Sequence, residues 1–256
     1  MGRGDFVSGG TELSSSASYA VGDPSAGRGL GRAAGFGYLA IFLTGIPWFG
    51  VMQAFRAGGD AALLGHIRQG EALFRLSILS GAATFVAYLV TASLLYRRYR
   101  TEAGVAVTLL FAFVVGSVPF SLLAVVRQME LLTLATGERL PPADLLAQTA
   151  SLMHDWDAVG QLSSLFWGLW LLPLAWLAWR SRGSGRLAGV FVALGGLGYM
   201  SVFIKPMVWP GPAGLGPIDL AFAAATVLSE FTITLWLIFA SDRPRNPAMA
   251  LSTQPA

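Results

Sequence analysis

The chain has 256 residues and a formal net charge of +3 at pH 7, and 54% of its residues are hydrophobic while only 12% are charged. Soluble domains carry about 25% charged residues, so a fold whose whole surface faces water is excluded, and lipid must cover much of it. The arginines flank apolar stretches instead of forming one basic face, which argues against a nucleic-acid-binding protein. The absence of cysteine excludes disulfides, thiolate catalysis and cysteine-ligated metal sites.

Residues 1–32 are rich in glycine and serine and lack the continuous apolar core of a signal peptide, so they are predicted to form a disordered tail. A second tail is predicted at 242–256. The domain between them, 33–241, contains six apolar stretches of about 20 residues, the length of a membrane-spanning helix. We therefore predict an all-α, polytopic membrane bundle of six transmembrane helices, at 34–54, 73–96, 104–127, 158–179, 186–207 and 218–240.

The arginines concentrate at alternate ends of these stretches, and this pattern predicts the orientation. Ten of them adjoin one side: Arg28, Arg32, Arg97, Arg98, Arg100, Arg180, Arg182, Arg186, Arg243 and Arg245. The opposite gaps hold fewer cations, and acidic residues dilute them. The positive-inside rule then places both termini in the cytoplasm. The excess of arginine, alanine and glycine indicates a GC-rich bacterial genome, so the predicted location is a bacterial cytoplasmic membrane.

Two outer gaps are predicted to contain short amphipathic helices. One follows Gly58 and Gly59, with Asp60 as a possible cap and its apolar residues on one face. The other occupies 141–154 and starts at a Pro-Pro-Ala-Asp sequence. Such helices can lie on the outer membrane surface or cap the bundle, and the sequence favours neither.

Glu230 is the most informative single residue, because an ionisable side chain near the middle of a membrane helix marks either a function or a buried pair. Thr226, Glu230 and Thr234 recur every four residues, so they share one helix face. The functional interpretation makes Glu230 a candidate catalytic acid. The structural alternative is a neutral Glu230, or one locked to Arg75 or Lys205 to fix helix packing.

Polar residues in the outer halves of the other predicted helices suggest a cavity that opens outward, with Glu230 at its floor. Its basic mouth would come from one residue on each of three helices. The predicted ligand-binding residues are Arg75, Arg127, His154, Asp157, Gln161, Lys205 and Glu230.

Three functions fit this cavity. The first is a binding or accessory protein that holds a lipid or other amphiphile, with an anionic head near the basic mouth. The second is an intramembrane enzyme acting on a lipid or isoprenoid, with Glu230 as general acid. The third is a small proton-coupled transporter. The expected partners are membrane lipids and no nucleic acid, a purely structural role stays open, and no cofactor is predicted.

Two other chemistries receive little support. His66 and His154 with Asp155 and Asp157 are residue types that suit zinc, but the two histidines lie far apart in sequence. Ser164, His154 and Asp157 share one helical face, whereas a catalytic triad converges from different elements. No metal site is predicted.

Five stretches spread over roughly residues 31–240 carry a resemblance to a known family: GRAAGFGYLAIFLTGI, EALFRLSIL, GQLSSLFWGLWLLPLAWLAWRS, RLAGVFVALGGLGY and LSEFTITLWLIF. With these stretches, the chain resembles the uncharacterised bacterial membrane family known as domain of unknown function 4386. The resemblance implies that Arg75 and Glu230 are the characteristic charged positions, with His154 close to a histidine that precedes the fourth span. It implies a membrane fold and no particular reaction.

Overall fold

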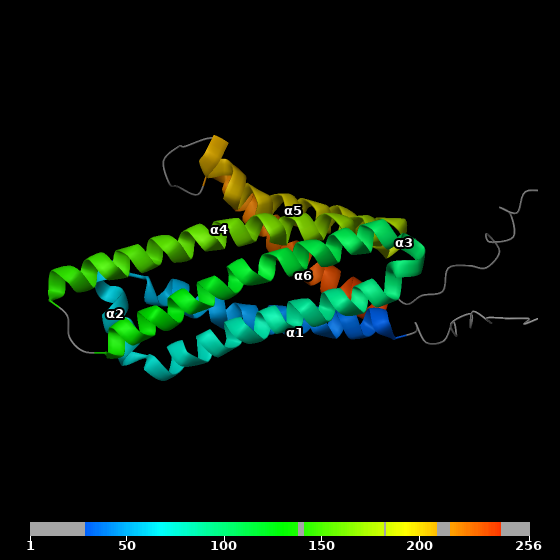
Figure 1. The fold of residues 1–256 in the computed structure, drawn as a ribbon. Helices are drawn as coiled ribbons and strands as arrows, with labels where there is room; N and C mark the ends of the chain where they lie inside the picture. The colour runs from blue at the N-terminus through cyan, green and yellow to red at the C-terminus, as the bar shows by residue number, and fades with distance from the viewer. Residues whose placement is uncertain (1–28, 138–140, 182, 209–215, 242–256) are drawn as a thin grey trace, which may run out of the picture.

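The computed structural model describes residues 29–137, 141–181, 183–208 and 216–241, and this part of the chain is all-α. Its helices are α1 (Leu30–Phe55), α2 (Asp60–Gln69), α3 (Glu71–Thr136), α4 (Pro142–Arg180), α5 (Ser184–Val208) and α6 (Pro217–Phe239), as Figure 1 shows. The prediction of an all-α protein is confirmed. Most of the two predicted tails lies outside the described residues, and α1 already begins at Leu30.

Five of these helices, all except α2, are long and apolar enough to cross a membrane, so the chain is a multi-pass membrane protein. The predicted spans 73–96 and 104–127 both lie within α3, one on each side of a break in its helical geometry. At 66 residues, α3 is far longer than one crossing requires. Its backbone leaves helical geometry at Ala103 (φ −151°, ψ 45°), and there the helix turns back on itself (Figure 1).

We call residues 71–102 the first arm of α3 and residues 104–136 its second arm. Close to the bend the arms pack through Tyr96 and Phe111, whose ring centroids lie 5.8 Å apart. The last turn of the first arm carries an ion pair between Arg98 and Glu102, 2.8 Å apart. The predicted gap that holds Arg97, Arg98 and Arg100 thus consists of the helical end of the first arm and the bend at Ala103.

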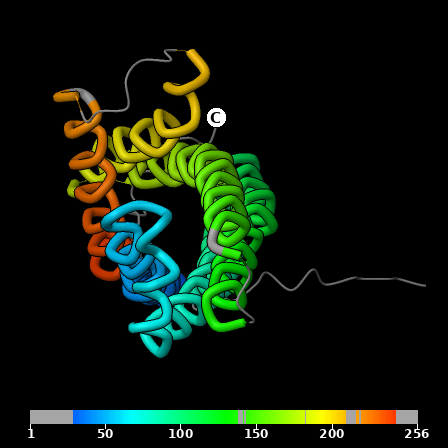
Figure 2. Tube along the Cα trace, turned by 90° about the vertical axis from the view of Figure 1, so that its left-hand side faces the viewer, coloured from blue at the N-terminus to red at the C-terminus, as the bar shows by residue number. Residues whose placement is uncertain are grey.

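The long helices form a closed ring. Going round it, α1 contacts α3, α3 contacts α4, α4 contacts α5, α5 contacts α6, and α6 returns to α1. Figure 2 shows this ring from one end. Side chains from all five helices therefore meet along a common axis, and large buried residues such as Tyr38, Phe85 and Trp170 fill it.

Of the two predicted amphipathic helices, one is a separate helix in the structure and the other is part of a longer helix. The helix predicted after Gly59 is α2, and Leu63 and Ile67 on its apolar face are fully buried, so it caps the bundle instead of lying on the membrane. Its N-cap is Gly59 (φ 82°), a conformation that suits glycine. The second predicted amphipathic helix, 141–154, is no separate element, because it forms the first turns of the 39-residue α4.

Candidate functional site

Glu230 lies inside the ring of helices. The residue is 8% exposed, and its Oε1 accepts a 2.9 Å hydrogen bond from the hydroxyl of Tyr199 on α5. The hydroxyl of Tyr38 on α1 also interacts with this carboxyl, without reaching the geometry of a well-formed hydrogen bond. No cation pairs with Glu230 among the described residues. Two phenol groups therefore take the place that a basic partner would have.

Aromatic rings surround this carboxyl. Tyr38 stacks on Trp170 of α4 with centroids 5.5 Å apart, and Tyr88 of the first arm meets the same indole edge-on at 5.2 Å. Trp167, one turn earlier on α4, meets Tyr199 edge-on at 5.9 Å. Tyrosine and tryptophan faces carry partial negative charge, so the surroundings of Glu230 favour positive charge. We call Tyr38, Tyr88, Trp167, Trp170, Tyr199 and Glu230 the central cluster.

A second polar group continues from the central cluster towards the α2 end of the bundle. Trp48 meets Trp167 edge-on at 6.3 Å and donates its indole N–H to Oε1 of Gln128 across 2.8 Å. Buried Nε2 of Gln128, Nε1 of Trp167 and Oγ of Ser121 have no hydrogen-bond partner among the described residues. Buried polar groups are normally paired, so this level of the bundle has a surplus of donors.

Ion pairs close the α2 end of the axis. Arg56, the C-cap residue of α1, binds both carboxylate oxygens of Asp157 on α4, at 2.8 and 2.9 Å, and its guanidinium lies 5.8 Å from the ring centre of Trp156. Arg127 of the second arm bridges Glu130 at 2.7 Å and Asp155 at 3.1 Å. Each cation is matched by at least one carboxylate, so this end of the bundle is charged but largely neutralised.

The predicted site residues fall into separate groups. Glu230 lies in the central cluster, while Arg127 and Asp157 lie in the ion pairs at the α2 end of the bundle. Arg75 pairs instead with Glu71 on its own helix at 2.7 Å, with half of its side chain exposed. Lys205 binds Asp219 at the start of α6 across 2.6 Å. The structure therefore does not join Arg75 or Lys205 to Glu230.

The remaining predicted residues lie on α4 and α6. His154 is exposed, and Gln161 is half-buried. The hydroxyls of Thr226 and Thr234 donate to carbonyls one turn back on α6, at Phe222 and Glu230. These threonines satisfy their own backbone, as membrane helices commonly allow. Among the described residues no group of three His, Asp or Glu side chains is placed to hold a metal.

The chain was compared with known protein families. The model of a domain of unknown function, DUF4386, matches residues 33–240, which is most of the chain. The chain belongs to the DUF4386 family. No curated protein and no solved structure matches it.

The DUF4386 match spans every residue of the central cluster, from Tyr38 to Glu230. The sequence pattern singled out Glu230 but missed the aromatic residues around it, such as Tyr38, Tyr88 and Trp170. A signal for them was present, because a phenol hydroxyl in the middle of an apolar span needs a polar partner. The hydrophobic fraction of the chain counts tyrosine and tryptophan with the aliphatic residues, so it does not register that need.

Proposed function

We propose that this DUF4386 protein crosses the membrane six times with both termini in the cytoplasm of a bacterium. The bend at Ala103 supports this, because each arm of α3 has a length suited to one crossing. The arginines at 97, 98 and 100 lie at that bend, on the side that the positive-inside rule assigns to the cytoplasm. Glu230 is then reached from the outer face, past the ion pairs at the α2 end of the bundle.

We infer that the central cluster binds a positively charged nitrogen, as a small organic amine or as the head of an amphiphile. The observation that carries this is a buried carboxyl which has tyrosine donors and aromatic rings around it but no cationic partner among the described residues. An unpaired buried charge is costly. A cation that contacts the carboxylate and the faces of tyrosine and tryptophan relieves that cost.

The ion pairs of the predicted basic residues favour a cationic ligand over an anionic one. Arg75, Arg127 and Lys205 would have held an anionic head, yet each is already paired with a carboxylate. An anion would have to compete with those carboxylates. Tyr199 is half-buried and Glu230 is 8% exposed, so the pair is not completely enclosed by the helices.

Intrinsic fluorescence provides a direct test, because Trp48, Trp167 and Trp170 lie in or beside the cluster. The full chain in nanodiscs is titrated with tetramethylammonium, dodecyltrimethylammonium and, as an anionic counterpart, dodecyl phosphate. Saturable quenching by a cation and none by dodecyl phosphate is expected. Saturation by dodecyl phosphate alone would contradict the proposal.

Variants separate this site from general membrane partitioning. Glu230→Gln keeps the shape of the side chain but removes its charge, and it is expected to abolish the saturable signal. Glu71→Gln is the matched control, because Glu71 belongs to an exposed ion pair on the same protein and is 42% exposed. If both variants lose binding equally, or neither does, Glu230 is not the binding carboxylate.

A second candidate function follows from the Tyr199–Glu230 hydrogen bond. A phenol that donates to a buried carboxyl forms a short relay that can hold and pass a proton. Such a relay supports either an intramembrane acid acting on a lipid or isoprenoid, or proton-coupled transport. Proteoliposomes with an internal pH dye test the transport form. Proton flux that depends on an added amine and is lost in Glu230→Gln would favour it over simple binding.

A further inference from the structure

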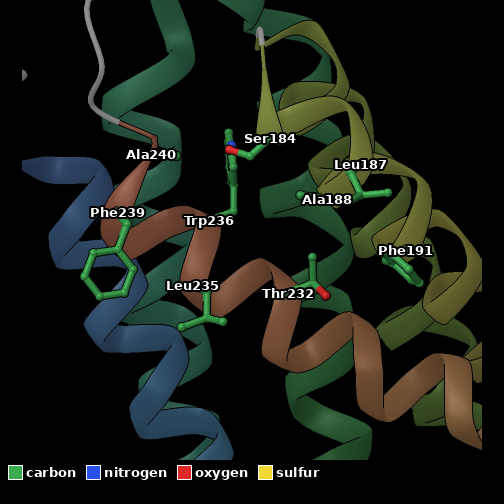
Figure 3. A pocket seen from close by; sticks show the side chains of 9 residues that line it. All are labelled: Ser184, Leu187, Ala188, Phe191, Thr232, Leu235, Trp236, Phe239 and Ala240. Atoms are coloured by element: carbon green, nitrogen blue, oxygen red, sulfur yellow. The ribbon is translucent and has the colours of Figure 1, made fainter.

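An apolar groove lies on the outer surface of the bundle, between the first turns of α5 and the last turns of α6 (Figure 3). Its volume is about 330 Å³. Its lining on α6 begins at Thr232, two residues after Glu230, and it faces outwards, since Leu187, Leu235 and Phe239 on its walls are 62%, 54% and 67% exposed. In a membrane, these exposed apolar walls contact lipid.

The groove is open because α5 and α6 approach each other most closely at another level, near Gly195 and Gly198. A Cβ atom at Gly195 would overlap the side chain of Ser229, and one at Gly198 would overlap Thr226. These glycines let the two backbones approach closely at that level. Towards Ser184 the helices diverge, and small residues such as Ala188 leave the wedge between them open.

One end of the groove has hydrogen-bond donors that lack acceptors. Trp236 is 5% exposed, and its indole N–H has no partner among the described residues. Figure 3 shows the indole nitrogen directed towards Ser184, an exposed residue whose side chain can shift to admit an acceptor. Ser184 begins α5, and the first N–H groups of a helix have no partner within it. This end therefore suits an anion.

The charge around this end has the matching sign. Arg186 is exposed on the first turn of α5, and Arg180 lies at the end of α4 with its guanidinium 4.7 Å from the ring centre of Trp176. Arg32 on α1 donates to the carbonyl of Ile238, next to the groove residue Phe239. Three arginines and the positive end of the α5 dipole thus belong to the helix ends at the Ser184 side of an otherwise apolar groove.

We propose that this groove binds an anionic phospholipid from the cytoplasmic leaflet. One acyl chain lies between α5 and α6, and the phosphate is held at the Ser184 end by the α5 N-terminus, the Trp236 indole and the neighbouring arginines. A second copy of the chain is a poorer occupant. Two-fold packing on this groove would bring the same arginines against each other, which costs free energy.

Native mass spectrometry tests the proposal on the full-length protein. Detergent-purified protein is mixed with phosphatidylglycerol or phosphatidylcholine of identical acyl chains, and the retained lipid is counted. One retained phosphatidylglycerol, bound more tightly than phosphatidylcholine, is expected. Equal retention of the two lipids would overturn the proposal, because the anionic head would then play no part.

Three variants locate the site. Thr232→Trp fills the groove and is expected to abolish the specific retention, whereas Leu228→Trp places the same ring one turn away, outside the groove lining. Arg186→Gln is expected to lower the phosphatidylglycerol preference about fivefold, as loss of one basic residue near a lipid head does. Because Arg186 is exposed, this variant stays informative even if Thr232→Trp fails to fold. Unchanged retention in Arg186→Gln, or equal loss in Leu228→Trp, would place the lipid elsewhere.

Discussion

The hydroxyl of Tyr199 on α5 donates to the carboxyl of Glu230 on α6 across 2.9 Å, and this bond joins two helices in the interior of the ring. Glu230 is the one carboxylate of the central cluster, and Tyr199 is its best-placed donor. The interaction links helix packing to any chemistry at Glu230. The predictions below separate these two roles.

The Tyr199–Glu230 bond is expected to stabilise the fold. Tyr199→Phe removes the donor and leaves the buried carboxyl short of a partner, which should lower the free energy of unfolding by about 1–3 kcal/mol. Unfolding in mixed detergent, followed by circular dichroism, measures this. Tyr96→Phe is the control, because Tyr96 is 36% exposed and its loss should cost under about 0.5 kcal/mol. Equal effects would show that the bond contributes little.

Arg75 and Glu230 are expected to be energetically independent. Arg75 pairs with Glu71 on the surface, so Arg75→Ala should cost at most about 1 kcal/mol. In a double-mutant cycle with Glu230→Gln, the two changes should add to within about 0.5 kcal/mol. A coupling of several kcal/mol would instead reveal a buried ion pair between them, and would contradict the arrangement described above.

Gly81 is expected to be intolerant of a side chain. A Cβ atom there would lie 2.7 Å from Nε1 of Trp48, the nitrogen that binds Gln128. Gly81→Ala should therefore displace the indole and destabilise the protein by about 1–3 kcal/mol. It should also shift the tryptophan emission spectrum.

Gly50→Ala provides the comparison for Gly81→Ala. Gly50 also lies within a helix, but no atom lies within 4 Å of its added Cβ. Alanine favours helix there, so this variant should be neutral or up to about 1 kcal/mol more stable. Destabilisation by both changes would mean that helix geometry, and not the Trp48 contact, decides the effect.

The two arms of α3 are expected to cross the membrane in opposite directions. The absence of natural cysteine makes single-cysteine variants straightforward to interpret. A membrane-impermeant maleimide should label Ala57→Cys and Gly137→Cys in intact cells, and Thr101→Cys only after permeabilisation. All three positions are exposed. Labelling of both Ala57→Cys and Thr101→Cys from outside would rule out the crossing of the first arm.

Much of the helix layout was predictable from the sequence, because a helix that faces lipid needs only a long apolar stretch. The predicted spans at 34–54, 186–207 and 218–240 agree closely with α1, α5 and α6. The predicted spans at 73–96 and 104–127 lie in the two arms of α3. The arginine-rich gap between them contains the bend at Ala103, and its residues before that bend remain helical.

The sequence by itself determined the apolar helices, the alternation of arginines and the presence of a carboxyl in α6, because each of these properties is local. Only the tertiary structure decided which side chains meet Glu230. Several cations could have paired with it, and the choice depends on how each helix is rotated and where helices cross. Close contacts at Gly195 and Gly198 bring α5 against α6, and the ring closure brings Tyr38 to the same point. Such distances depend on packing between helices that are far apart in the chain, so spacing within one helix cannot predict them.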